Sequence, residues 1–171
     1  MRYSFIFYRD RSFQDDQEDV DDDKDNFNFC ADIDKFKDHV KTVKTFGGDD
    51  IPEDMMSGLS KGLQQKFESN IKAAFLIFDA PSHGKDYHDD NIPDNNPDSG
   101  ETIEQFVKEY AEKSIYMGLL MLGRKNFYTA QKTYDAILNE YQRNQKSDHI
   151  YQLKIDSIIV QDLNDQLDQS N

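Results

Sequence analysis

A short apolar run, Ala73 to Phe78, constrains the fold of this chain more than any other stretch. It contains no polar residue and ends at Asp79, with Pro81 close behind. Uninterrupted runs of this length are typical of strands that are buried on both faces of a parallel sheet. We therefore expect this strand at the centre of a sheet. Because ligands of open α/β sheets gather beyond the carboxyl ends of the strands, Asp79 and the loop after it are the first place to look for a site. An aspartate that merely caps a turn is the competing interpretation.

Strand and helix patterns alternate along the rest of the chain. Such alternation implies parallel crossovers, so we predict a three-layer, Rossmann-like α/β sheet that is mostly parallel and has one antiparallel edge strand. That edge is a hairpin between two strands, separated by an acidic segment whose charges repel one another. The predicted strands cover residues 2–8, 26–31, 72–79, 114–122 and 150–155, and the predicted helices cover 33–43, 50–67, 102–111 and 127–141.

Three of the predicted helices begin at a recognisable capping signal. Asp32 or Asp34 is the expected cap of the first helix, and Asp50 stands before a Pro and a Glu at the start of the second. Thr102 and Gln105 have the spacing of a capping box, in which each side chain accepts a hydrogen bond from the other residue's backbone.

The formal net charge of −14, from 34 acidic and 20 basic residues, bounds the partners of the chain. Such a surface repels phosphate backbones and anionic membranes, so we expect neither nucleic acid nor membrane as partner and favour basic proteins or divalent cations. An acidic surface that only keeps the protein soluble is the simpler interpretation. Cys30 is the single cysteine, which excludes an internal disulfide. No secretory leader or membrane-length apolar run occurs, so a cytoplasmic location is expected.

Four motifs follow predicted strands or precede predicted helices. They are Tyr8-Arg9-Asp10; Gly47-Gly48-Asp49 with Pro52-Glu53-Asp54; Phe78-Asp79-Ala80-Pro81-Ser82-His83-Gly84; and Tyr87-His88 with Asn91, Pro93-Asp94 and Pro97. Their order and intervals resemble the von Willebrand factor type A domains associated with atypical alpha-kinases. The resemblance covers residues 2–156 and implies a domain over 1–158 with a polar tail over 159–171. Where members of that group commonly have cysteine before the His-Gly pair, this chain has Ser82.

The resemblance also implies a divalent-ion site, but an incomplete one. Domains of that family bind the ion through three loops, the first with an Asp-x-Ser-x-Ser pattern, and no such segment precedes residues 2–8. The implied ligands are Asp79 and Asp49, with Asp50 or Asp10 nearby. Because hard cations want several oxygen ligands, we expect these residues to hold Mg²⁺ or Ca²⁺ weakly at most.

The missing first strand of the family would lie between the strands at residues 2–8 and 72–79. Leaving its place open would expose two rows of unpaired backbone groups, which is costly. We therefore expect these two strands to pair directly, as in a sheet truncated at its amino end. A strand donated by another chain, or a fragment whose beginning lies upstream, are the alternatives.

The loops at residues 46–54 and 80–100 are the expected partner-binding surface of the sheet. Histidines in a polar loop more often fix its shape through hydrogen bonds, and a transition-metal site is the less common alternative. The residues that we predict to contact a protein partner are His83, Tyr87, His88, Asp89 and Asp90.

No phosphate-binding loop, nucleophile elbow or kinase signature is present in the sequence. The chain is therefore predicted to be a non-catalytic protein-interaction module with weak divalent-cation dependence. One alternative is a regulatory fragment of a larger alpha-kinase-containing protein. Another is a metal-dependent enzyme that uses Asp79 with His83 and His88.

Overall fold

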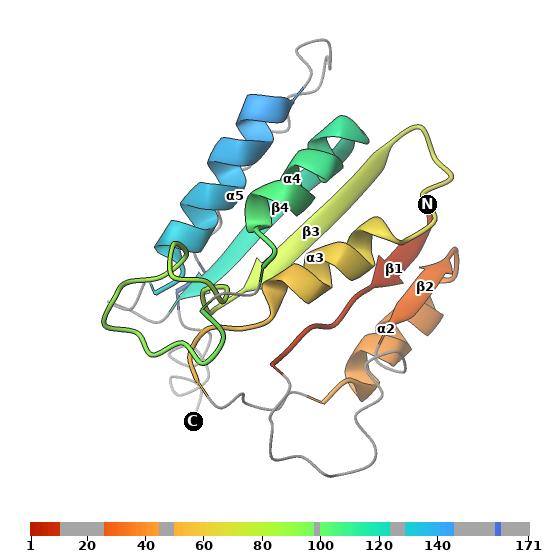
Figure 1. The fold of residues 1–171 in the computed structure, drawn as a ribbon. Coiled ribbons are helices and arrows are strands. Elements are labelled where there is room, and N and C mark those ends of the chain that lie inside the picture. Colours follow the sequence, from red (N-terminus) through yellow and green to blue (C-terminus); the bar gives the residue numbers. More distant parts are fainter. Residues whose placement is uncertain (11–25, 45–49, 98–99, 124–128, 146–159, 162–171) are drawn as a thin grey trace.

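The computed structural model describes residues 1–10, 26–44, 50–97, 100–123, 129–145 and 160–161. Helices and strands alternate along this part of the chain, which confirms the predicted α/β class (Figure 1). No helix within these residues is both long and apolar enough to cross a membrane. The elements are β1 Tyr3–Phe5, β2 Phe27–Cys30, α2 Ile33–Thr42, α3 Met55–Leu63, β3 Lys72–Phe78, α4 Ile103–Glu112, β4 Ile115–Gly123, α5 Gln131–Asn144 and β5 Val160–Gln161.

The described strands form two small sheets instead of one. β3, β4 and β5 are parallel, with β4 in the middle, while β1 and β2 form the predicted antiparallel hairpin. Phe5 of β1 and Leu76 of β3 therefore belong to different sheets, and the prediction that these two strands pair directly is wrong. The single three-layer, Rossmann-like sheet predicted from the sequence is not confirmed.

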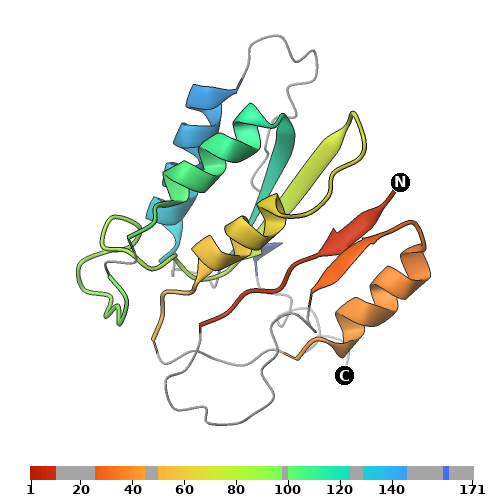
Figure 2. The ribbon, with the colours of Figure 1, turned by 45° about the vertical axis from the view of Figure 1, so that its right-hand side comes forward.

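The side chain of Tyr8 links the β1 segment to β3. No backbone pairing connects these two strands in the described chain. The Tyr8 ring packs on α3 so closely that a Cβ added to Gly58 would lie 2.7 Å from the ring. Its hydroxyl donates a hydrogen bond to the backbone oxygen of Ile77, at 3.4 Å. Residues 6–10 thus run alongside α3 toward the end of β3 (Figure 2). Within the described residues the two segments are linked by this side chain and not by a backbone ladder.

Gly58→Ala is expected to destabilise the fold by about 1–3 kcal/mol, the usual cost of overpacking a core. The added methyl group would meet three atoms of the Tyr8 side chain at 2.7–2.9 Å. Urea unfolding of the variant and the parent measures the change in free energy. The same substitution made in a Tyr8→Ala background should cost much less, and an equal cost in both backgrounds would show that Tyr8 is not the obstacle.

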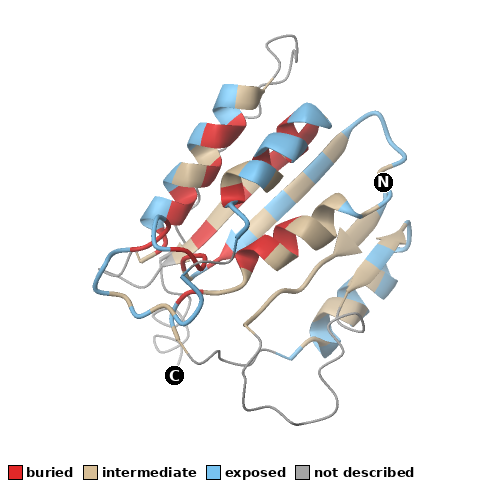
Figure 3. Ribbon diagram, in the orientation of Figure 1, coloured by how far each residue is buried: buried red, intermediate tan, exposed pale blue. Residues whose placement is uncertain are grey.

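The core lies between β3–β4 and the three helices that cover one face of this sheet (Figure 3). Alternate residues of β4 point into it, because successive side chains of a strand face opposite sides. α4 packs on β4 and lies between α3 and α5. The core residues from these elements include Met55, Leu59, Ile103, Val107, Tyr110, Ile115, Met117, Leu119, Met121, Ile137 and Tyr141.

The opposite face of β3 is exposed, so the prediction of a central strand buried on both faces is wrong. Phe75 is 72% exposed and Ile77 is 53% exposed, while Phe78 is buried. β3 is also an edge of its sheet among the described strands, with β4 on one side. The run Ala73 to Phe78 is apolar at every position. Such a composition does not show whether the strand is covered on one face or on both.

Helix caps follow the local rules at two of the three predicted starts. Asp32 caps α2, and Thr102 and Gln105 form both halves of the capping box of α4. Asp50 does not cap α3, since that helix begins at Met55 and is capped by Asp54. Asp50 is instead held at the candidate site described below.

A short carboxyl-terminal strand that the sequence did not predict lies at Val160 and Gln161. Val160 and Gln161, which the sequence assigns to a polar tail beginning at residue 159, pair with Leu122 and Gly123 of β4. The predicted strand at 150–155 lies outside the described residues. This strand follows residue 158, where the predicted domain ends, and the boundary itself stays a prediction.

Candidate functional site

Buried polar side chains concentrate in the segment that follows β3, which we call the histidine loop (residues 79–97). Ser82, His83 and His88 are three of the five buried polar or charged residues in the described chain. A fourth, Thr133 at the start of α5, contacts this loop directly. Because buried polar groups are costly unless paired, the hydrogen bonds of the two histidines, of Thr133 and of the Ser82 N–H show how the loop is built; the Ser82 hydroxyl itself is buried without a partner in the described chain.

Asp94 is the centre of the histidine loop. Its carboxylate lies 2.7 Å from Nδ1 of His83 and 3.0 Å from Nε2 of His88, and it accepts the backbone N–H groups of Gly84 and Asn96 at 2.8 Å. Burial alone would raise the pKa of Asp94, but the hydrogen bonds from His88, Gly84, His83 and Asn96 lower it to about 2. Asp94 is therefore ionised. Its carboxylate holds both histidine rings and the backbone N–H groups of Gly84 and Asn96.

His83 links the loop to the segment after β1. Its Nδ1 faces Asp94, and its Nε2 lies 2.7 Å from Oδ1 of Asp10. Burial lowers the pKa of His83, but the hydrogen bonds and charges of Asp10 and Asp94 outweigh burial and raise it to about 9. At neutral pH the ring is a cation that donates a hydrogen bond to a carboxylate on each side.

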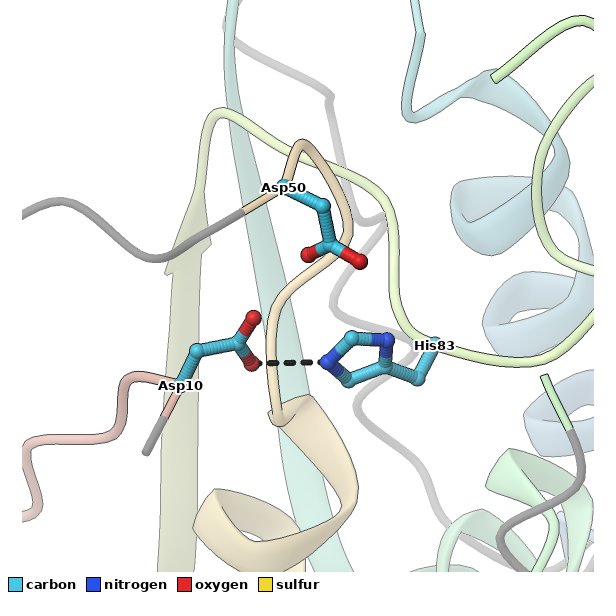
Figure 4. A group of neighbouring side chains, drawn as sticks. All are labelled: Asp10, Asp50 and His83. Carbon is cyan, nitrogen blue, oxygen red and sulfur yellow. Dashed lines mark hydrogen bonds and ion pairs between the residues drawn. The ribbon is translucent and has the colours of Figure 1, made fainter. Parts of the chain in front are cut away.

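Asp50 brings a second carboxyl group to the same place. Together, Asp10, Asp50 and His83 offer ligand atoms that all lie within 4.8 Å of one another (Figure 4). Burial raises the pKa of Asp50; the hydrogen bond from the Asn95 backbone opposes this effect, and the nearby Asp10 adds to it. One Asp50 oxygen accepts the Asn95 N–H at 2.6 Å, and the other is buried and accepts no hydrogen bond from the described chain.

Backbone pairing holds the segment of Asp50 against the histidine loop. Glu53 forms a parallel bridge with Ser82, in which the Glu53 N–H donates to Pro81 at 2.9 Å and the His83 N–H donates to Glu53 at 3.2 Å. The Glu53 carboxylate also accepts the N–H of Asp10 at 3.1 Å. Three stretches that are distant in sequence, represented by Asp10, Asp50 and His83, are thereby fixed side by side.

Thr133 and Tyr87 anchor the loop to the helices. The Thr133 hydroxyl accepts the Ser82 N–H at 3.0 Å and donates to the Tyr87 backbone oxygen at 2.9 Å. The Tyr87 hydroxyl donates to Glu104 at 2.6 Å and accepts the N–H of Ile103 at 3.0 Å. Sequence reasoning missed Thr133, because a threonine in a helix carries no signal that it faces a distant loop.

The histidines and Tyr87 have a different position from the one predicted for partner contacts. His83, Tyr87 and His88 are only 7%, 6% and 4% exposed, so they hold the loop together from inside and do not present a contact surface. The interpretation that the histidines fix the loop through hydrogen bonds is confirmed. Of the predicted contact residues, only Asp89 and Asp90 are exposed.

The predicted metal ligands are only partly brought together. Asp50 belongs to the cluster of Figure 4, and so does Asp10, which the sequence placed nearby. Asp79 is exposed and is not one of the three clustered residues. Burial raises the pKa of Glu53, and the charges of Asp10 and Asp79 raise it further. Asp49 lies outside the described residues. His83 also belongs to the cluster. It lies 73 positions from Asp10 in the sequence, so no rule of residue spacing predicts their contact.

Comparison with known proteins gives a weak similarity to one kinase. The chain is 27% identical over 124 residues to the alpha-protein kinase vwkA of Dictyostelium discoideum. The match covers 71% of this chain but 20% of that protein, so the chain spans about a fifth of the relative's length. No family model and no solved structure matches. The predicted resemblance is therefore supported in part: the chain has a weakly similar alpha-protein kinase relative, whose name suggests a von Willebrand type A domain.

Proposed function

We propose that this chain is a non-catalytic interaction unit of the von Willebrand type A kind, which binds a basic protein surface through the outer side of the histidine loop. The observation that carries this proposal is the contrast between the two sides of the loop. His83 and His88 are buried and bonded to Asp94, whereas Asp86, Asp89 and Asp90 are exposed. A loop that is already fixed loses little conformational entropy when a partner binds.

The charge of the exposed side favours a basic partner. Asp89 pairs with Lys132 at 3.0 Å, but Asp86 and Asp90 form no ion pair with a cation of the described chain. The net charge of −14 adds a long-range attraction for positively charged proteins, which speeds association more than it strengthens binding. A cytoplasmic location, where such partners are available, is part of the same proposal.

The absence of catalysis is also proposed, and the bonding of His83 supports it. Both of its ring nitrogens face carboxylates, Asp10 on one side and Asp94 on the other. A general base needs a nitrogen within reach of a substrate proton, and this arrangement provides none.

Reversing the exposed charges tests the proposed interaction. Asp86→Lys/Asp90→Lys is expected to weaken capture of partner proteins about tenfold or more, because unlike charges in the complex become like charges. The matched control is Asp34→Lys/Asp38→Lys on α2, which changes the net charge equally at exposed positions remote from the loop. Crosslinking and mass spectrometry in cells that express each variant measure the captured set.

The control separates a local surface from a general charge effect. Thermal unfolding should first show that both variants fold as the parent does. Proteins that the parent and the α2 variant capture, and that the loop variant loses, support the proposal. Equal losses in both variants, or a loss in neither, would contradict it.

A second candidate is a regulatory segment of a larger alpha-kinase-type polypeptide. It is favoured by the match to a fifth of an alpha-protein kinase. In that case the bound surface belongs to the same polypeptide. Sequencing the transcript that encodes this chain tests the idea, since an alpha-kinase domain in the same reading frame is required.

A further inference from the structure

We infer that Asp10, Asp50 and His83 form a binding site for a divalent transition-metal ion of the Zn²⁺ class. The inference goes beyond the proposed partner binding and does not depend on it, since none of the three is among the exposed aspartates proposed to contact the partner. One residue comes from the end of the β1 segment, one from the stretch before α3, and one from the loop after β3. An ion bound there would tie these three segments together.

The distances between the side chains suit such an ion after a small contraction. The ligand atoms of the three residues lie within 4.8 Å of one another, and their side chains converge on one space (Figure 4). Ligands in a tetrahedral Zn²⁺ site lie about 3.4 Å apart, because each metal–ligand bond is about 2.0–2.2 Å long. The contact of Asp10 with His83, now 2.7 Å, would open slightly while Asp50 moves inward.

An unpaired oxygen of Asp50 is the second, independent observation. The Asp50 side chain points between Asp10 and His83 (Figure 4), and its Oδ1 is buried without a hydrogen-bond donor in the described chain. A buried acceptor left unsatisfied costs about 1–3 kcal/mol. A cation in the space between the three residues would satisfy this oxygen and separate the facing carboxyl groups of Asp10 and Asp50.

The surroundings of His83 match those of a metal-binding histidine. Such a ligand commonly donates its other ring N–H to a carboxylate, which fixes the orientation of the ring. Nδ1 of His83 lies 2.7 Å from Asp94, whose side chain is 4% exposed and is held in turn by His88 and Gly84. Nε2 therefore points toward Asp10, with the ring held in place.

Binding is an exchange of a proton for the metal ion. The Nε2–H bond of His83 breaks, its proton leaves to solvent, and the nitrogen lone pair is donated to the ion. Asp10 and Asp50 each donate a carboxylate oxygen, and a water molecule completes four ligands. No electron is transferred. One imidazole and two carboxylates favour Zn²⁺, Co²⁺ or Mn²⁺, whereas Ca²⁺ and Mg²⁺ prefer a shell of oxygens alone.

The test uses the full chain after removal of metal with EDTA. Zn²⁺ binding is measured by isothermal titration calorimetry, with Mg²⁺ and Ca²⁺ titrated separately. Asp50→Asn removes one ligand charge but keeps an oxygen that can accept the Asn95 N–H, so the fold is expected to survive. This variant should bind Zn²⁺ about 10–100-fold more weakly, as loss of groups at metal sites typically does. The matched control, Asp79→Asn, alters a nearby exposed aspartate outside the cluster and should bind as the parent does.

A structural measurement identifies the histidine without changing it. X-ray absorption of the Zn²⁺-loaded chain should show imidazole scattering in a first shell of nitrogen and oxygen, at about 2.0–2.2 Å. No Zn²⁺ binding, binding that is unchanged in Asp50→Asn, binding that is lost in Asp79→Asn, a shell without imidazole, or Mg²⁺ or Ca²⁺ bound as tightly as Zn²⁺ would each overturn the inference. The partner-capture experiment is a separate measurement, so the two can fail independently.

Discussion

Asp94→Ala is expected to lower the free energy of unfolding by about 3–5 kcal/mol, the usual cost of removing one partner from a buried charge pair. The variant leaves His83, His88, Gly84 and Asn96 without the carboxylate that each contacts at 2.7–3.0 Å. Urea unfolding in excess EDTA measures the change without any contribution from bound metal.

Two control variants show whether the loss of stability comes from the buried hydrogen bonds of Asp94. Asp94→Asn keeps one acceptor oxygen and should lose less stability than the alanine variant. Asp89→Ala removes an exposed carboxylate from the same loop, where its pair with Lys132 contributes about 0–1 kcal/mol. If Asp94→Ala and Asp89→Ala had the same stability, the hydrogen bonds around Asp94 would not determine the structure of the loop.

Thr133→Val is expected to destabilise the fold by about 2–4 kcal/mol, although the two side chains have nearly the same shape. The change leaves the Ser82 N–H and the Tyr87 oxygen without the hydroxyl that pairs with both. Each buried group left unpaired costs about 1–3 kcal/mol. Calorimetric or urea unfolding measures the loss.

Thr133→Ser is the matched variant, because it keeps the hydroxyl and removes only a methyl group. It should be less damaging than Thr133→Val. The opposite order would mean that the methyl group, and not the hydroxyl, matters at this position. Backbone hydrogen exchange at Ser82 adds a local test, since its N–H should lose protection in the valine variant.

Local sequence rules worked where neighbouring residues decide the structure. The capping box of Thr102 and Gln105 forms because both partners lie within one turn of helix. Asp32 caps α2 for the same reason. The carboxylate of Asp50 has an equally good local signal for capping, yet it bonds to Asn95, 45 positions away. The hydrogen bond to Asn95 forms in place of a helix cap at Asp50. A capping pattern does not show whether such a distant partner exists.

The pairing of strands was harder to predict. The apolar pattern identifies β3 but does not say which strand lies at its side, because backbone hydrogen bonds are the same for any neighbour. The sequence assigns Tyr8 to the first strand, but β1 ends at Phe5; the Tyr8 ring lies against Gly58, and its hydroxyl reaches Ile77. The hydrogen bond to Ile77 spans 69 positions of sequence, so only the tertiary structure reveals it.

The sequence by itself determined the α/β alternation, the opening hairpin, and the caps of α2 and α4. These features arise from periodicity and from contacts between near neighbours. Only the tertiary structure decided that Asp10, Asp50 and His83 meet, and that Asp94 and Thr133 hold the loop from inside. Burial and the pairing of buried charges act between residues that folding brings together, regardless of their separation along the chain.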